Sequence, residues 1–292
     1  GYPIEGLWIS GLQRKMTIDN LSFPFKVLSS LAKSRKLIRK FKPDIAIGTG
    51  GFASGPLLWA AASKGVPCLI QEQNSFPGIT NKLLSKKVAR ICVAYDKMER
   101  FFPKEKLVLT GNPLRKDLQI ALPADAQVKE KLGLKPGWPT LLILGGSLGA
   151  RRINELISSE LENLQKMELN IIWQCGKLYY DSLTAKHQNL PDHIKLQAFI
   201  SDMREAYAAS DIMISRSGAN TLSELAVVGK AAILIPSPNV AEDHQTKNAE
   251  ALSSKSAALL FKETRDSQEL VALVQELLED PQKQKDLQNN IQ

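Results

Sequence analysis

The segment from Ser215 to Glu224 combines hydroxyl groups, a glycine and a carboxylate directly after an apolar run. Ser217 and Gly218 would lie at the start of a helix, where free backbone N–H groups and the helix dipole favour an anion. Glu224 could accept hydrogen bonds from two ribose hydroxyls. Thr221 and Glu224 also match a capping box, in which the glutamate only satisfies a backbone N–H at the start of the helix. The local sequence leaves both interpretations open.

A glycine-rich loop, Gly145 to Ala150, follows another apolar run and precedes a helical pattern. Its backbone N–H groups and the Ser147 hydroxyl could bind a diphosphate. The loop is not a P-loop, because no Lys-Ser or Lys-Thr pair follows its last glycine at the required spacing. Glycine turns between strands and helices are also common for steric reasons alone. A third turn of this kind, Gly48 to Gly51, lies in the first part of the chain.

Three further clusters of polar residues follow predicted strands or begin predicted helices. Gln71 to Asn74 presents amides and a carboxylate, which suit recognition of sugar hydroxyls and N-acetyl groups. Arg115 is expected where two domains meet, so that its guanidinium could reach a phosphate or a sugar. Glu242 to Ala249 opens a helix with carboxylate, imidazole and amide groups. Each cluster also has a plainer explanation, as a polar loop, a surface arginine or an ordinary helix start.

The composition is that of a globular protein with one large core or, more in keeping with the length, two ordinary ones. The chain has 292 residues, of which 43% are hydrophobic and 23% are charged. No apolar run approaches the roughly 20 residues that cross a bilayer. Cys68, Cys92 and Cys175 lie far apart without metal-ligand spacing, and the histidines do not cluster. We therefore expect core thiols and no metal site.

Basic residues are concentrated in the first part of the chain. Up to Asp117 there are 20 Lys and Arg against 8 Asp and Glu, whereas the remainder has 18 against 22. An anionic partner is therefore expected for the first part. Nucleic acid is disfavoured, because the chain has no RNP, zinc-finger or helix-turn-helix signature and its aromatic residues are not interleaved with the basic ones. A phosphate-bearing lipid or an anionic membrane surface fits better.

The most basic stretch, residues 21–43, has the pattern of a helix in which Leu28, Leu31 and Ile38 recur at helical spacing. Aromatic residues beside basic ones are typical of a helix that lies on an anionic membrane. The alternative is a solvated basic face over an ordinary packed helix. The residues expected at the membrane are Phe23, Phe25, Lys26, Lys33, Lys36 and Lys40.

Predicted strands and helices alternate along the whole chain. This alternation with short connections predicts an α/β protein with two doubly wound, Rossmann-like domains, whose ligands bind at the carboxyl ends of the strands. The expected domains are 1–117 and 118–292. The predicted strands are 44–48, 67–71, 90–94, 107–110, 140–144, 169–174, 195–198, one beginning at 211, 231–235 and 257–261, and the predicted helices are 21–43, 56–63, 79–85, 126–132, 150–165, one ending at 228, 244–254 and 267–279.

Six motifs occur in the order and approximate spacing of the MurG family of bacterial glycosyltransferases, which the chain resembles over essentially its whole length. The resemblance implies a GT-B fold, in which the first domain faces the acceptor and the membrane and the second binds UDP-GlcNAc. It also implies inverting transfer of N-acetylglucosamine to the C4 hydroxyl of lipid I, the undecaprenyl-diphosphate-linked N-acetylmuramoyl-pentapeptide. The product, lipid II, would serve peptidoglycan synthesis. The motifs are Gly48 to Pro56, Glu72 to Asn74, Gly111 to Arg115, Gly145 to Ala150, Arg216 to Glu224, and Asp243 to Ala249.

The resemblance further implies roles for single residues. Asn74 and Gln245 would bind the GlcNAc moiety, and Ile200 would lie beside the uracil. Arg115 and Ser147 would bind the diphosphate. The segment expected to hold the nucleotide, with Glu224 on the ribose, consists of Ala219, Asn220, Thr221, Leu222, Ser223 and Glu224.

The same resemblance implies a metal-independent active site without a cofactor, on the cytoplasmic face of the bacterial inner membrane. The general base is not identified, and the candidates are Glu72 and His244. Members of the family begin with a Gly-Gly-Thr-Gly-Gly-His loop, which does not occur in this sequence. We therefore expect a fragment, shortened at both ends, that binds UDP weakly and does not transfer the sugar by itself.

Two alternatives come from other classes of protein. A UDP-GlcNAc 2-epimerase would share the two-domain fold and the UDP site, but it would not need a lipid surface. A non-catalytic UDP-binding protein would keep the nucleotide site alone.

Overall fold

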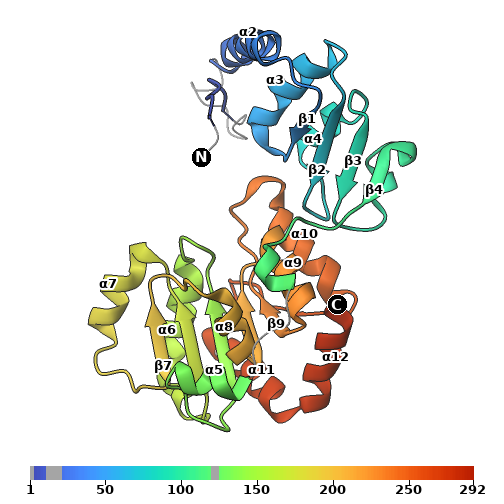
Figure 1. The fold of residues 1–292 in the computed structure, drawn as a ribbon. Coiled ribbons are helices and arrows are strands. Elements are labelled where there is room, and N and C mark those ends of the chain that lie inside the picture. The colour runs from blue at the N-terminus through green and yellow to red at the C-terminus, as the bar shows by residue number, and fades with distance from the viewer. Residues whose placement is uncertain (1–2, 11–21, 120–124) are drawn as a thin grey trace. The chain divides into compact units, whose positions relative to one another are not determined.

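The computed structural model describes residues 3–10, 22–119 and 125–292. The chain folds as two compact units, Gly1–Asn112 and Pro113–Gln292 (Figure 1). This division lies a few residues before the boundary expected at residue 117. Each unit is built on a parallel sheet whose strands are joined through helices, as the alternating pattern predicted.

The first unit contains a four-stranded sheet in the order β1-β2-β3-β4, with every neighbouring pair parallel. Parallel neighbours need crossover connections, and α3 and α4 supply the first two. The long helix α2 packs on α3. The elements are α2 (Phe23–Phe41), β1 (Ala46–Gly48), α3 (Gly51–Ala62), β2 (Cys68–Glu72), α4 (Ile79–Leu84), β3 (Arg90–Val93), β4 (Leu107–Leu109) and the 3₁₀ turns Met98–Arg100 and Lys104–Lys106.

Helix α3 begins earlier than the sequence predicted. The prediction placed its start at Pro56, but the helix begins at Gly51 and Pro56 lies inside it. Gly50 and Gly51 have φ angles of 87° and 74°, in the left-handed region that costs glycine little. A Cβ atom at Gly48 would overlap the Leu58 side chain. Steric demands of the turn and of strand-helix packing therefore account for these glycines.

The second unit contains a six-stranded parallel sheet in the order β10-β9-β8-β5-β6-β7. The strand order reverses beside β5, so the connections after β5 and β8 leave toward opposite faces. Ligands of such sheets bind at this switch point, beyond the carboxyl ends of the strands. The strands are β5 (Thr140–Leu144), β6 (Asn170–Gln174), β7 (Ile194–Gln197), β8 (Ile212–Ser215), β9 (Ala231–Leu234) and β10 (Leu259–Leu260).

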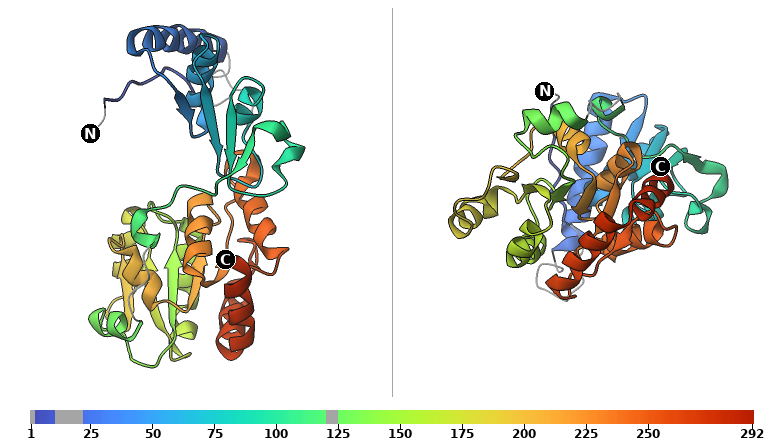
Figure 2. Two further views of the ribbon diagram at one scale, coloured as in Figure 1. Left: turned by 45° about the vertical axis from the view of Figure 1, so that its right-hand side comes forward. Right: turned by 90° about the horizontal axis from the view of Figure 1, so that it is seen from below.

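Helices cover both faces of this sheet (Figure 2). One buried cluster joins the sheet to α6, α7 and α11, and a second joins the opposite face to α5, α8, α9 and α10. Strand β5 is buried on both faces, with Ile143 in the first cluster and Leu142 in the second. The helical elements are η3 (Lys116–Gln119), α5 (Asp125–Lys131), α6 (Arg151–Gln165), α7 (Lys177–Lys186), α8 (Met203–Ala209), α9 (Ala219–Val228), η4 (Ala241–Asp243), α10 (His244–Ser253), α11 (Ser267–Glu279) and α12 (Pro281–Ile291).

The sequence prediction omitted α7, α8 and α12. Helix α7 buries only Leu183, so it has no apolar stripe to detect. Helix α8 buries four consecutive residues, 206–209, and therefore lacks helical periodicity. Its start is fixed by Asp202, whose side chain accepts a hydrogen bond from the Glu205 N–H. Helix α12 is polar apart from Leu287 and Ile291 at its buried face.

Candidate functional site

The glycine loop after β5 is held against the turn that follows β6. A Cβ atom at Gly149 would overlap the carbonyl of Cys175, and one at Gly176 would overlap the carbonyl of Leu148. The two backbones can approach this closely only because both residues are glycines. Ser147 is exposed at the tip of the loop, which opens into α6. The loop thus has the strand-turn-helix geometry of an anion site.

Gln174 is a residue of this edge that the sequence reasoning missed. It ends β6 and is 4% exposed. Its Nε2 donates to the Gly146 carbonyl at 2.9 Å, and its Oε1 accepts from the Ile200 N–H at 2.8 Å. The amide therefore fixes the glycine loop relative to the loop after β7. A buried polar residue ending a run of apolar ones was the available signal.

Glu224 does not form the capping box that the sequence allowed. Helix α9 begins at Ala219 with Gly218 as its N-cap, so Thr221 already lies inside the helix. The Glu224 Oε2 atom accepts a hydrogen bond from the Tyr207 hydroxyl at 2.5 Å, and Oε1 lies 3.9 Å from Arg115 Nε. The Glu224 side chain is 20% exposed. It is thus a partly open carboxylate on the second turn of α9.

The pKa of the Tyr207 hydroxyl is affected by burial and by the charge of Glu224. Burial raises the pKa of its hydroxyl well above the usual range, and the negative charge of Glu224 raises it further. The phenol therefore stays protonated and donates to the carboxylate. Arg115 supplies positive charge near the other carboxylate oxygen, Oε1, at 3.9 Å. The Glu224 carboxylate thus has a hydroxyl donor at one oxygen and a guanidinium near the other.

The segment that leads into α9 is held by a hydrogen bond to the first turn of α10. The Ser217 hydroxyl, fully buried, donates to the Gln245 carbonyl at 2.8 Å. The Ser237 N–H donates to Gln245 Oε1 at 2.9 Å, and His244 begins α10 beside it. The starts of α9 and α10 are therefore joined. Among the predicted nucleotide residues, Asn220 is exposed, Leu222 belongs to the core, and Ala219, Thr221, Ser223 and Glu224 are intermediate.

The polar cluster of the first unit has a different character. Glu72 ends β2 and is 2% exposed. Its Oε1 accepts from the backbone and side-chain amides of Asn74 at 3.1 and 3.2 Å, and its Oε2 accepts from Gly78 N and Asn81 Nδ2 at 3.1 and 2.8 Å. The carboxylate organises the loop after β2 and presents Asn74. These four donors do not favour Glu72 as a general base.

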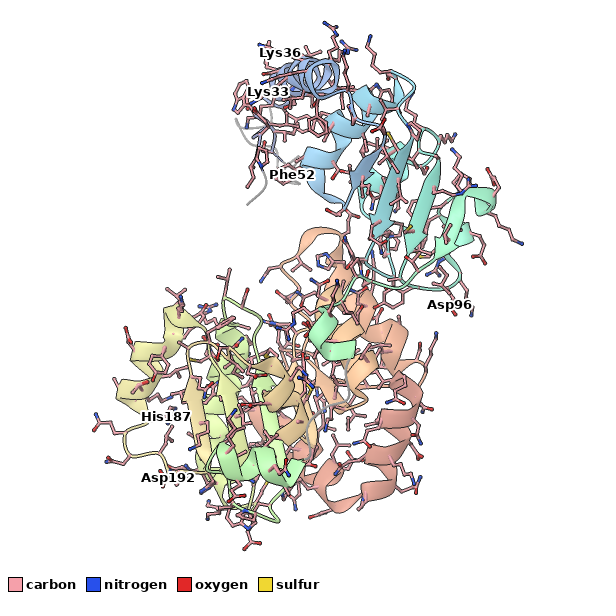
Figure 3. The ribbon with its side chains drawn as sticks, viewed as in Figure 1. Lys33, Lys36, Phe52, Asp96, His187 and Asp192 are labelled. Atoms are coloured by element: carbon pink, nitrogen blue, oxygen red, sulfur yellow. The ribbon has the colours of Figure 1, made fainter. Side chains whose placement is uncertain are left out.

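Helix α2 displays most of the residues expected at a membrane. Its buried side consists of Ser30, Ser34 and Ile38, whereas Phe25 and Leu28 are 67% and 65% exposed. Leu28 thus lies outside the buried side of α2 that contains Ile38. Lys33 and Lys36 project from this helix (Figure 3). Lys36 and Lys40 are exposed, Phe23 is half-buried, Lys33 pairs with Glu5 at 3.2 Å and Lys26 donates to Ser10 at 3.1 Å.

Metal sites and membrane-spanning helices are two further features to consider in the described residues. In residues 3–10, 22–119 and 125–292, no group of three or more His, Cys, Asp and Glu side chains is placed to hold a metal ion. No helix within these ranges has the length and apolarity needed to cross a bilayer.

Comparison with known proteins identifies the family. Residues 1–93 match the glycosyltransferase family 28 N-terminal domain, and residues 140–292 match the glycosyltransferase family 28 C-terminal domain. The chain belongs to glycosyltransferase family 28. Its GT-B fold and its class, a glycosyltransferase, follow from this membership together with the two parallel sheets.

Named members of family 28 match the whole chain. It is 55% identical over 291 residues to the UDP-N-acetylglucosamine--N-acetylmuramyl-(pentapeptide) pyrophosphoryl-undecaprenol N-acetylglucosamine transferase of Cytophaga hutchinsonii, covering 100% of this chain and 78% of that protein. The transferase of the same name from Flavobacterium psychrophilum is 54% identical, with 100% and 79% covered. The predicted resemblance to the MurG family is confirmed.

Solved structures give the same family and a wider fold group. The crystal structure of Acinetobacter baumannii MurG has a TM-score of 0.73 and 31% identity, covering 92% of this chain and 74% of that one. A structure of MnaA from S. aureus with UDP has a TM-score of 0.66 and 15% identity, covering 91% and 75%. The second likeness, at this identity, shows the fold alone.

Proposed function

We propose that this family 28 glycosyltransferase transfers N-acetylglucosamine from UDP-GlcNAc to the C4 hydroxyl of lipid I, with inversion, to give lipid II. The observation that carries the proposal is the match to two transferases of this name at 55% and 54% identity along the whole chain. The partly open Glu224 carboxylate beside Arg115 supports it, because a UDP-sugar presents ribose hydroxyls and a diphosphate.

The second unit supplies the proposed nucleotide site. Glu224 accepts hydrogen bonds from the ribose hydroxyls, and Arg115 and Ser147 neutralise the diphosphate together with the starts of α6 and α9. The backbone beside Ile200 receives the uracil. Gln245 binds the GlcNAc moiety, and so does Asn74 of the first unit. The proposed nucleotide segment is Ala219, Asn220, Thr221, Leu222, Ser223 and Glu224.

In the proposed reaction the acceptor hydroxyl attacks the anomeric carbon of GlcNAc while the bond to UDP breaks. Negative charge then grows on the departing diphosphate. Donors and helix N-termini aimed at that charge lower the barrier, because they stabilise the transition state more than the bound substrate. His244, at the start of α10 beside Gln245, is the remaining candidate for the general base, because the Glu72 carboxylate already accepts four hydrogen bonds.

A transfer assay tests the proposal. The protein is incubated with UDP-GlcNAc carrying a labelled sugar and with lipid I in detergent micelles. Because these 292 residues are expected not to transfer the sugar by themselves, they are assayed joined to the N-terminal glycine-rich segment of a family 28 relative; label is then expected in the lipid fraction, and Glu224→Ala is expected to abolish it. A parallel incubation with UDP-GlcNAc alone addresses the 2-epimerase alternative. Formation of the 2-epimer there, with no labelled lipid in the complete reaction, would refute the transferase.

We also propose that α2 docks the enzyme on the anionic surface of the inner membrane as a peripheral protein. Phe25 and Leu28 provide exposed apolar contacts, and lysines on the same helix provide charge. Trp8 and Ile4, in the segment that runs along α2, are also exposed, at 59% and 93%. Aromatic and aliphatic side chains within a basic surface suit the interfacial region of such a bilayer.

A further inference from the structure

Glu263, in the loop after β10, joins three loops at the carboxyl edge of the second sheet. Its carboxylate pairs with Arg216 Nη1 at 2.7 Å, and the Arg216 and Glu263 side chains are only 14% and 17% exposed. Arg216 directly follows β8. Because β9 lies between β8 and β10 in the sheet, the ion pair spans the ends of three adjacent strands.

Each of the two residues also takes part in a hydrogen bond between a side chain and a backbone carbonyl. Arg216 Nη1 donates to the carbonyl of Ile235, directly after β9, at 3.0 Å. The Glu263 carbonyl accepts from Nε of Arg152 at 2.8 Å. Arg152 is the second residue of α6, which follows the glycine loop. One network therefore connects the loops after β8, β9 and β10 with the start of α6.

This network ends next to both proposed phosphate-binding segments. Arg152 lies two residues after Ala150, the last residue of the glycine loop. Arg216 precedes Ser217 and Gly218, which lead into α9, and Ser217 is itself bound to the Gln245 carbonyl at 2.8 Å. A displacement of Arg216 would consequently move the starts of α9 and α10 together, while a displacement of Arg152 would move the start of α6.

We propose that Glu263 is a positioning residue for the UDP site, because it fixes the N-termini of α6 and α9 relative to each other. The inference rests on the proposed function, since it concerns a diphosphate bound by both helix starts at once. Two sets of N–H donors can serve one diphosphate only if their spacing is correct, and small errors in such geometry are costly. A mostly enclosed ion pair with directed hydrogen bonds defines that spacing more narrowly than apolar contact would.

The test is calorimetric titration of UDP into the parent protein and into Glu263→Gln, a variant that keeps the side-chain shape but removes the charge. UDP binding by the variant is expected to weaken about ten- to hundredfold. In the transfer assay the KM for UDP-GlcNAc should rise while the KM for lipid I is unchanged. A variant that lost thermal stability but bound UDP like the parent would overturn the inference.

A matched control lies at the opposite end of β8. Asp211 precedes that strand, and Lys129 Nζ pairs with Asp211 Oδ2 at 3.2 Å, with the lysine side chain 9% exposed. Lys129→Met should lower the thermal stability of the second unit and leave UDP affinity unchanged. Equal weakening of UDP binding by Lys129→Met and Glu263→Gln would show a general loss of rigidity and would overturn the inference.

A second variant covers the case in which Glu263→Gln does not fold. Arg152 is 38% exposed in its side chain, so Arg152→Gln removes one arm of the network without stranding a buried charge. It should weaken UDP binding several-fold, and unchanged affinity would overturn the inference. A parent protein that does not bind UDP at all would refute the proposed function as well, whereas normal binding by the parent and by both variants would refute the positioning role alone.

Discussion

Glu72 at the end of β2 and Glu224 on the helix that follows β8 are two glutamates whose carboxylates have different surroundings. Glu72 in the first unit is 2% exposed and accepts four hydrogen bonds from its own loop. Glu224 in the second unit has a side chain that is 20% exposed, with the Tyr207 hydroxyl at one oxygen and Arg115 near the other. A carboxylate filled by internal donors fixes a loop, whereas one with an open side can bind a ligand. Exposure and donor count therefore mark Glu72 as structural and leave Glu224 as the candidate for ligand binding.

The largest effect is expected from removal of the Glu72 carboxylate, which accepts four hydrogen bonds. Glu72→Ala would remove one acceptor from the partly buried donors of Asn74 and Gly78 and from the buried side chain of Asn81. Each such donor costs roughly 1 to 3 kcal/mol, so a total loss of about 4 kcal/mol is expected after partial hydration. Thermal unfolding and hydrogen exchange of the first unit measure it, with Glu72→Gln as the milder control. Intact stability combined with lost sugar transfer would instead make Glu72 a reacting group.

Removal of the open carboxylate should have the opposite signature. Glu224→Ala is expected to weaken UDP binding by about 2 to 4 kcal/mol, because the ribose hydroxyls lose a charged acceptor. Glu250→Ala is the matched control, because it removes an exposed carboxylate from α10 outside the proposed nucleotide segment and should leave UDP affinity unchanged. Calorimetry with UDP measures both variants. Unchanged affinity in a folded Glu224→Ala protein would remove this residue from the nucleotide site.

The two units also differ in charge, because basic residues are concentrated in the first. Lys33, Lys36 and Lys40 changed together to Glu should abolish binding to anionic vesicles, since each basic residue near such a surface contributes about 1 kcal/mol. UDP affinity should not change. Exposed lysines of the first unit outside α2, Lys64, Lys86 and Lys104 changed to Glu, provide a control of equal charge. Equal loss of vesicle binding in the two triple variants would assign the attraction to overall charge rather than to α2.

The smallest expected effect is a pH dependence confined to the second unit, which contains all the histidines. His187, labelled in Figure 3, lies 2.6 Å from the Ser158 hydroxyl, and burial lowers its pKa, with the charge of Lys186 adding to the effect. Burial likewise lowers the pKa of His193. The unfolded chain therefore binds protons more readily than the folded one.

The second unit should therefore lose stability as the solution becomes more acidic. The stability that the two neutral histidines contribute is fully present above their unfolded pKa of about 6.5. This contribution declines as the pH falls below that value. Hydrogen exchange at pH 7.5 and 5.5 should show reduced protection in the second unit only, and His187→Gln should reduce the change. A decline of equal size in the first unit would contradict the assignment to histidine.

The sequence was sufficient for the alternation of strands and helices, because buried parallel strands such as 140–144 are continuous apolar runs bounded by turn residues. It also placed the glycine loop after β5 and the segment after β8 at the sheet's carboxyl edge. It failed for α7 and α8, where one buried residue or a block of four gives no helical period. Local sequence patterns thus determined the elements with a regular apolar period.

Only the tertiary structure decided what each polar residue does. Thr221 and Glu224 have the spacing of a capping box, but the position of Gly218 as N-cap excludes it, and Tyr207 reaches Glu224 from another helix. Gln174 and Glu263 gave no motif, yet each joins loops that are distant in sequence. Hydrogen bonds between segments depend on which side chains come into contact in the folded chain. Local sequence patterns do not show which distant residues will be in contact. The residue types that could bind a nucleotide were fixed by the chain, and which carboxylate stays open was fixed by packing.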